Sequence, residues 1–165
     1  GKEFVVQTSQ GPLGGIITET EAYTQDDPAS HSYQGRRTPR NTPMFESAGQ
    51  IYAYFIYGMY FCLNIVTEQK GVGAAVLIRG LQPTQGVDQM VLNRQWKKNN
   101  LKGFTDGPGK LAQALGVSKE WNAYRVGESP IFVMDSEVKP KSIQRLPRVG
   151  ISRAKDRLWR FRAIV

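Results

Sequence analysis

The chain has 165 residues, 40% hydrophobic side chains and a net charge of +8, which suit one folded domain over residues 1–165 and exclude a disordered chain. A single cysteine, Cys62, and a single histidine, His31, exclude an internal disulfide framework and a cage of several Cys or His ligands, so we expect no metal and no cofactor. The excess of basic over acidic side chains, with a pI near 9.7, indicates an acidic partner.

The first two predicted elements are strands. Residues 3–8 and residues 15–23 flank a Gln-Gly-Pro turn at residues 10–12. Side chains alternate between the two faces of a strand, so the second strand places four of its residues on one face, namely Ile17, Glu19, Glu21 and Tyr23.

Two carboxylates therefore share one strand face. Such a pair is typical of glycoside cleavage, in which one acid activates water and another protonates the leaving group. An ion pair between one of these carboxylates and an arginine such as Arg79 is the more frequent explanation in ordinary domains. The spacing of Glu19 and Glu21 leaves both interpretations open.

Residues 24–43 are polar and contain three prolines, which predicts a long surface loop. The loop carries His31, which can stack on a base, donate a hydrogen bond or be held by a neighbouring aspartate. It also carries three candidate phosphate-binding side chains, Arg36, Arg37 and Arg40.

Residues 50–56 and 60–66 form a predicted hairpin with Gly58 at its tip. Six of the seven tyrosines lie between Tyr23 and Tyr60. We expect Tyr52 and Tyr60 in the core, whereas Tyr57 at the tip is well placed to wedge into a duplex.

The remaining predicted elements are a strand at residues 74–80, helices at 84–96 and 108–115, and strands at 130–134 and 158–164. The first helix has a candidate apolar face of Val87, Met90, Val91 and Leu92. Strands dominate without regular βαβ alternation, so we expect an α+β fold. Its predicted form is a compact domain with a curved, mainly antiparallel sheet, a protruding hairpin and short flanking helices.

The positive charge is concentrated late in the chain. Residues 139–165 hold nine basic side chains and one acid, Asp156. This grouping is typical of a phosphate-neutralising surface, although a solvated face that only confers solubility explains the charge equally well.

Residues 47–67 carry no charge and are long enough to span a membrane. The stretch contains four tyrosines, two glycines, Gln50 and Asn64, which a membrane-spanning helix disfavours. We therefore expect no membrane partner.

Six stretches in a fixed order carry a further pattern: residues 17–23, 31–32 with 37–41, 52–64, 77–83, 107–115 and 147–151. Together they closely resemble the alkyladenine (3-methyladenine) DNA glycosylase family. The similarity covers essentially the whole chain from Gly1, and the helix that family members carry before this point is absent.

The resemblance implies that Glu21 is the general base that activates water, with Arg79 and the backbone of Val149 beside that water. It implies that Tyr23, His31 and Tyr54 form the walls of a base pocket and that Asn64 disfavours guanine. Tyr57 is implied to fill the gap in the base stack, with Met59 supporting it. Lys110 and Arg148 join the three loop arginines as candidate phosphate-binding residues.

The implied activity is base excision repair by a monofunctional, monomeric glycosylase without lyase activity. Its partner is double-stranded DNA with damaged purines, among them 3-methyladenine, 7-methylguanine, hypoxanthine and ethenoadenine. The expected location is the nucleoid in a bacterial cytoplasm, or the nucleus in a eukaryote. The alternative is a non-catalytic module that binds single-stranded nucleic acid, which leaves Glu19 and Glu21 without a role.

Overall fold

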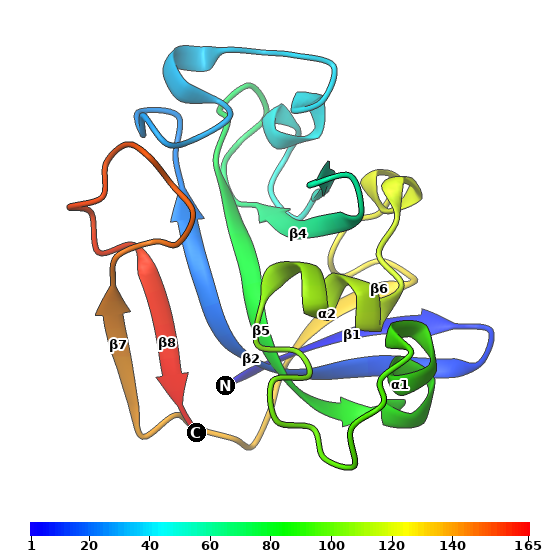
Figure 1. Cartoon of the computed structure of the whole chain (residues 1–165). Helices are drawn as coiled ribbons and strands as arrows, with labels where there is room; N and C mark the ends of the chain where they lie inside the picture. Colours follow the sequence, from blue (N-terminus) through cyan, green and yellow to red (C-terminus); the bar gives the residue numbers. More distant parts are fainter.

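The computed structural model describes residues 1–165, which form one eight-stranded sheet with two α-helices and three 3-10 turns (Figure 1). The elements in chain order are β1 (Lys2–Thr8), β2 (Gly11–Tyr23), η1 (Tyr33–Gly35), η2 (Thr42–Phe45), β3 (Ile51–Ile56), β4 (Tyr60–Val66), β5 (Ala75–Gln85), α1 (Val87–Arg94), α2 (Pro108–Leu115), η3 (Lys119–Ala123), β6 (Ile131–Asp135), β7 (Ser142–Leu146) and β8 (Arg160–Ile164). All strand pairs are antiparallel, which confirms the predicted α+β class.

The main path of the sheet runs β3-β4-β5-β2-β1-β6, and β8 joins it by pairing with β2. β2 changes its partner along its length. Its first half pairs with β1, while Glu19, Thr20 and Glu21 pair with β8. Register shifts between β2 and β5 around Glu19 mark an irregularity in the ladder at this change of partner. The end of β2 therefore lies between β5 and β8, two strands that carry arginines.

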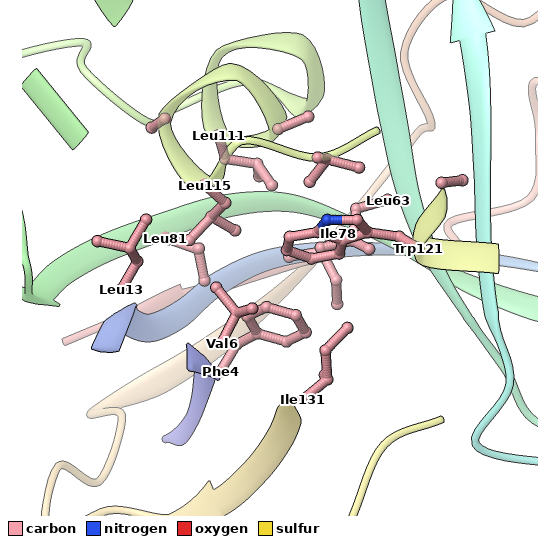
Figure 2. Packing of buried hydrophobic residues seen from close by; sticks show 14 of the residues in the cluster. Phe4, Val6, Leu13, Leu63, Ile78, Leu81, Leu111, Leu115, Trp121 and Ile131 are labelled. Atoms are coloured by element: carbon pink, nitrogen blue, oxygen red, sulfur yellow. The ribbon is translucent and has the colours of Figure 1, made fainter. Parts of the chain in front are cut away.

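The core lies between the sheet and the helices. α2 lies over the sheet, and its Leu111 and Leu115 point toward Ile78 and Leu81 of β5 (Figure 2). Phe4 stacks on Trp121 of η3 at a centroid distance of 6.4 Å. Burial of each such side chain contributes about 1.5–3 kcal/mol to the stability of the fold. The cluster therefore holds α2 and η3 against the sheet.

The β3–β4 hairpin turns through two residues in the left-handed region, Tyr57 at φ 51° and Gly58 at φ 69°. Two positive φ values in succession are typical of the type I′ turn that matches strand twist. Glycine adopts this conformation freely, whereas a bulky side chain such as that of Tyr57 rarely does. The predicted hairpin is confirmed, and the tip holds Tyr57 in a conformation that is common at functional sites.

Two predicted elements need correction. β5 continues to Gln85 because the first half of β2 offers it an edge to pair with. The first helix is shorter than predicted, since Gly86 and Gln95 both adopt the left-handed conformation at its ends. Met90 is buried on its inner side, but Leu92 is 67% exposed and does not belong to the apolar face.

β7 was not predicted; it pairs with β8 from Ser142 to Leu146 and is mostly exposed. The long loop at residues 24–43 contains η1 and the start of η2. None of the helices combines the length and the apolar composition that crossing a bilayer requires.

Candidate active site

A cavity of about 690 Å³ opens at the end of β2 where the strand leaves the sheet. It is lined by the end of β2, by β3 and β4, by the loop that follows β2 and by residues 149–153 of the loop between β7 and β8. These two loops lie at the same end of the molecule, away from both chain termini (Figure 1). The volume lies within the range of small-molecule sites.

Glu21 is the acidic residue that lines this cavity, and its side chain is completely buried within the protein. The backbone N–H of Val149 donates to its Oε1 at 2.8 Å, and the Tyr23 hydroxyl donates to its Oε2 at 2.8 Å. The Arg79 Nε lies 3.5 Å from Oε1. Two neutral donors and the Arg79 guanidinium therefore hold the carboxylate at the cavity wall, where its oxygens can accept a proton from a bound molecule.

Glu19 has different partners and does not line the cavity. Its Oε1 lies 3.0 Å from Arg79 Nε and 3.4 Å from an Arg160 nitrogen, while Oε2 accepts from Arg162 at 2.9 Å. Burial alone would raise the pKa of Glu19, but hydrogen bonds from Arg162 and Arg79 outweigh it and lower that pKa below its usual value. The predicted ion pair with Arg79 is therefore present at Glu19 at hydrogen-bond distance.

Arg148 holds the wall beside Glu21 in place. Its buried guanidinium forms a bidentate pair with Asp27 and donates to the carbonyl of Ala22 at 2.9 Å. The guanidinium Cζ lies 4.6 Å from the centre of the Tyr23 ring and 5.2 Å from that of Trp159. Burial would lower the pKa of Arg148, but the bonds to Asp27 raise it above its ordinary value.

The prediction that Arg148 binds phosphate is therefore wrong for this structure. No part of its side chain reaches solvent, and its charge is already matched by Asp27. Arg148 instead connects Tyr23 with the peptide whose N–H reaches Glu21, because Val149 follows it directly. Local sequence could not assign Asp27 or Trp159 to this cluster. Asp27 lies 121 residues from Arg148 along the chain, and Trp159 faces Arg148 only after folding.

The walls of the cavity are aromatic. Tyr23 and Tyr54 line it together with His31, whose ring centre lies 4.8 Å from that of Tyr54 in an edge arrangement. The His31 Nδ1 lies 2.9 Å from the Tyr52 hydroxyl. His31 is exposed at the mouth of the cavity, and partial desolvation there, with a smaller contribution from the charge of Arg40, lowers its pKa below the ordinary value. The structure brings Tyr23, His31 and Tyr54, which the resemblance placed in one pocket, to the same cavity, and the bond that Tyr52 makes from the core was not predicted.

Polar and small side chains form the floor. Asn64 is buried and donates its amide to the carbonyl of Tyr52 at 3.0 Å. Its side-chain oxygen makes no hydrogen bond within the protein, so it can accept one from a molecule in the cavity. Cys62 and Leu77 complete this floor, and neither was predicted to lie there.

The hairpin tip projects beside the cavity. Tyr57 is 84% exposed and Met59 is 63% exposed, an unusual state for two large side chains in sequence proximity. Phe55 lies half-exposed on the same hairpin and was not singled out by the sequence. The tip thus offers an apolar wedge that the protein itself does not cover.

The other candidate phosphate ligands lie at the surface in different settings. Arg36 and Arg40 are exposed beside the cavity. Arg37 stacks on Phe45 at 4.4 Å, and Lys110 pairs with Asp106 at 2.6 Å. Arg153, which sequence reasoning missed, lines the cavity from the opposite loop. No three His, Cys, Asp or Glu side chains gather as a metal ion requires.

Comparison with known proteins places this geometry in context. Residues 1–164 match the family model described as methylpurine-DNA glycosylase. A protein of Agrobacterium fabrum is 44% identical over 98% of this chain and 78% of its own length. A protein of Rhodopseudomonas palustris is 44% identical over 90% of this chain and 72% of its own length. A protein of Francisella tularensis is 42% identical over 90% of this chain and 78% of its own length. All three carry the name "Putative 3-methyladenine DNA glycosylase".

Proposed function

The chain belongs to the methylpurine-DNA glycosylase family, and from that premise we propose that it hydrolyses the N-glycosidic bond of damaged purines extruded from duplex DNA. The observation that carries the proposal is the setting of Glu21. A buried carboxylate faces an aromatic cavity and is held by two neutral donors, Val149 and Tyr23.

The hairpin tip supports base extrusion. A flipped nucleotide leaves a gap in the stack, and the exposed Tyr57 side chain has the size and flatness to fill it, with Met59 beside it. Flipping costs a few kcal/mol and is least costly for a damaged or mispaired base. Selection thus begins before the base reaches the cavity.

The cavity walls support recognition of an alkylated purine. Alkylation at N3 or N7 gives the base a positive charge, and the faces of Tyr23 and Tyr54 attract a cation. In a desolvated slot this attraction is worth about 2 kcal/mol or more. The free side-chain oxygen of Asn64 lies on the floor, where it discriminates among base edges by what they can donate.

Glu21 then acts as the general base. Water attacks C1′ of the sugar, its proton passes to Glu21, and the glycosidic bond electrons leave with the base. A cationic base departs as a neutral molecule and needs no proton from the protein. The carboxylate also stabilises the positive charge that develops on the sugar.

The side chains that line the cavity include no lysine, so no amine is present to attack C1′ and form a Schiff base. The proposed product is therefore an abasic site in an intact strand. Glu21 is the only carboxyl group in the lining and serves as the base, so no second carboxyl group is present to protonate a neutral leaving group. We accordingly expect faster release of 3-methyladenine and 7-methylguanine than of hypoxanthine.

The experiment is single-turnover base release from duplexes that each carry one defined lesion. We expect free base to appear and the strand to break only after alkali treatment. Strand cleavage without alkali would contradict simple hydrolysis. Binding to damaged DNA without release of any base would instead support the non-catalytic module.

A further inference from the structure

Arg40 is a charged side chain held against the aromatic wall of the base cavity. Its guanidinium Cζ lies 4.9 Å from the centre of the Tyr54 ring, and its Nη2 donates to the carbonyl of Phe55 at 3.0 Å. Arg40 and Tyr54 both line the cavity. The protein therefore fixes a positive charge on a wall of the cavity that is proposed to receive the damaged base.

No carboxylate neutralises this charge. Arg40 forms no ion pair, whereas Arg79, which also lines the cavity, lies 3.0 Å from Glu19 Oε1. Arg153 reaches the lining as well, but it contacts neither a carboxylate nor an aromatic ring of the wall. Arg40 is therefore the arginine of the lining that combines an unmatched charge with an anchor in the cavity wall.

The charge of Arg40 acts on the groups that surround the base. The ring centre of Tyr54 lies 4.8 Å from that of His31, and the charge of Arg40 contributes to the lowered pKa of His31. A cation against an aromatic ring also reduces the attraction of that ring for a second cation, because the two positive charges repel each other. Arg40 therefore opposes the entry of a cationic base, whereas a neutral base meets no such repulsion.

A neutral purine also gains from a nearby positive charge when it leaves. The electrons of the glycosidic bond stay with the base, so hypoxanthine or ethenoadenine departs as an anion and then takes a proton from water. Glu21 is the only carboxyl group in the lining and is occupied as the base. A fixed positive charge stabilises the negative charge that develops on such a leaving group. A cationic purine departs as a neutral molecule and draws no such stabilisation.

We propose that Arg40 is a specificity residue of the base cavity, whose positive charge favours the release of neutral damaged purines relative to cationic ones. The proposal rests on the proposed function, since it takes the cavity as the place of the damaged base. Relative to free DNA, Arg40 lowers the energy of the transition state for a neutral base, but not of that for a cationic base. Arg40 thus widens the range of lesions accepted by a cavity whose tyrosine faces favour cations.

The test compares Arg40→Gln with Arg40→Lys and with Arg37→Gln. Arg37 belongs to the same loop and stacks on Phe45 at 4.4 Å, but it does not line the base cavity. Each protein is assayed on duplexes that carry 7-methylguanine, hypoxanthine or ethenoadenine. The quantity compared is the single-turnover rate of base release divided by the enzyme concentration at half saturation, which refers every rate to free DNA. A lost contact to the DNA backbone lowers this quotient by the same factor for each lesion.

We expect Arg40→Gln to lower the quotient for hypoxanthine and for ethenoadenine about fivefold more than that for 7-methylguanine, as suits the charge of a solvent-exposed arginine. Arg40→Lys keeps the charge, so its ratio of neutral to cationic lesions should stay within about twofold of that of the wild type. Arg37→Gln should leave this ratio unchanged. Thermal unfolding of each variant verifies that it folds.

An equal loss on all three lesions in Arg40→Gln would overturn the proposal, because Arg40 would then act on the DNA backbone alone. Equal ratios in Arg40→Lys and Arg40→Gln would also overturn it, since the cause would be the shape of the side chain and not its charge. A shift confined to one of the two neutral lesions would do the same, because those lesions differ in shape.

The failure of this proposal can be told apart from the failure of the proposed function. If the wild type releases base from these duplexes but the ratio does not depend on the charge at residue 40, only the specificity assignment is refuted. If the wild type binds the duplexes and releases no base from any of them, the glycosylase activity is refuted and the specificity assignment falls with it.

Discussion

Glu19 and Glu21 lie two residues apart on β2, yet different groups surround their carboxylates. Three arginines from β5 and β8 surround Glu19, whereas Glu21 receives hydrogen bonds from a tyrosine and a backbone amide. Both carboxylates approach Arg79, but the contact with Glu19 is shorter, at 3.0 Å against 3.5 Å.

This difference separates Glu19, a carboxylate that stabilises the fold, from Glu21, a carboxylate that can act as a general base. A carboxylate neutralised by several guanidinium groups is a weak base, because its charged form is already stabilised. Three guanidinium groups contact Glu19, whereas Glu21 has only Arg79 beside it, at the longer distance. Both residues lie in the part of β2 that pairs with β8, and they differ in the groups that reach them. Arginine side chains of β5 and β8 reach Glu19, whereas the loop between β7 and β8 reaches Glu21 through the Val149 N–H.

The Arg148–Asp27 pair is the strongest single support of the Glu21 region, so breaking it is expected to have the largest effect on stability. Asp27→Asn leaves a buried guanidinium without a counter-charge, which costs about 3–5 kcal/mol of unfolding free energy. Urea denaturation measures the loss. The neighbouring Asp26→Asn is the control, since Asp26 is exposed and lies 3.8 Å from the half-buried Arg157. Equal losses in both variants would contradict this assignment.

Removal of the Tyr23 hydroxyl is expected to have the next largest effect. Tyr23→Phe keeps the ring against Arg148 but removes a hydrogen bond to a carboxylate, worth about 1.5–3 kcal/mol. We expect the single-turnover rate of base release to change by about tenfold or more while affinity for damaged DNA is retained. Tyr33→Phe, in a residue that does not line the base cavity, is the matched control and should react as the wild type does.

The Glu19 cluster should be visible in the pH dependence of stability. Its lowered pKa means that Glu19 contributes stability above its ordinary value of 4.5 and loses it as pH falls through the lower folded value. Unfolding free energy measured from pH 7 down to pH 3 should therefore decline less steeply in Glu19→Gln than in the wild type. Parallel curves for the two proteins would show that Glu19 does not titrate with a shifted pKa.

Much of the fold could be predicted because its signals are local. The Tyr-Gly turn marks the β3–β4 hairpin, and Pro108 and Gly116 bound α2 at the predicted residues. β7 gave no such signal, since its pairing with β8 depends on an edge that forms only in the folded protein. The length of β5 likewise depended on the extent of β2.

The candidate site was predictable only in part. Spacing placed Glu19 and Glu21 together but could not say which one faces arginines, because Arg160 and Arg162 approach only through β8. The choice of Glu21 came from family resemblance. Charge alone also could not show that Arg148 is buried against Asp27, 121 residues away.

The most direct test of the account compares Glu21→Gln with Glu19→Gln in single-turnover base release from a duplex with one 3-methyladenine analogue or 7-methylguanine. General base catalysis contributes about 10²–10⁴-fold, so Glu21→Gln should lose at least about a hundredfold in rate while it still binds the damaged duplex. Glu19→Gln should retain a rate within about tenfold of the wild type. Equal losses in the two variants, or a Glu21→Gln variant that releases base at the wild-type rate, would contradict the assignment of Glu21 as the residue that activates water.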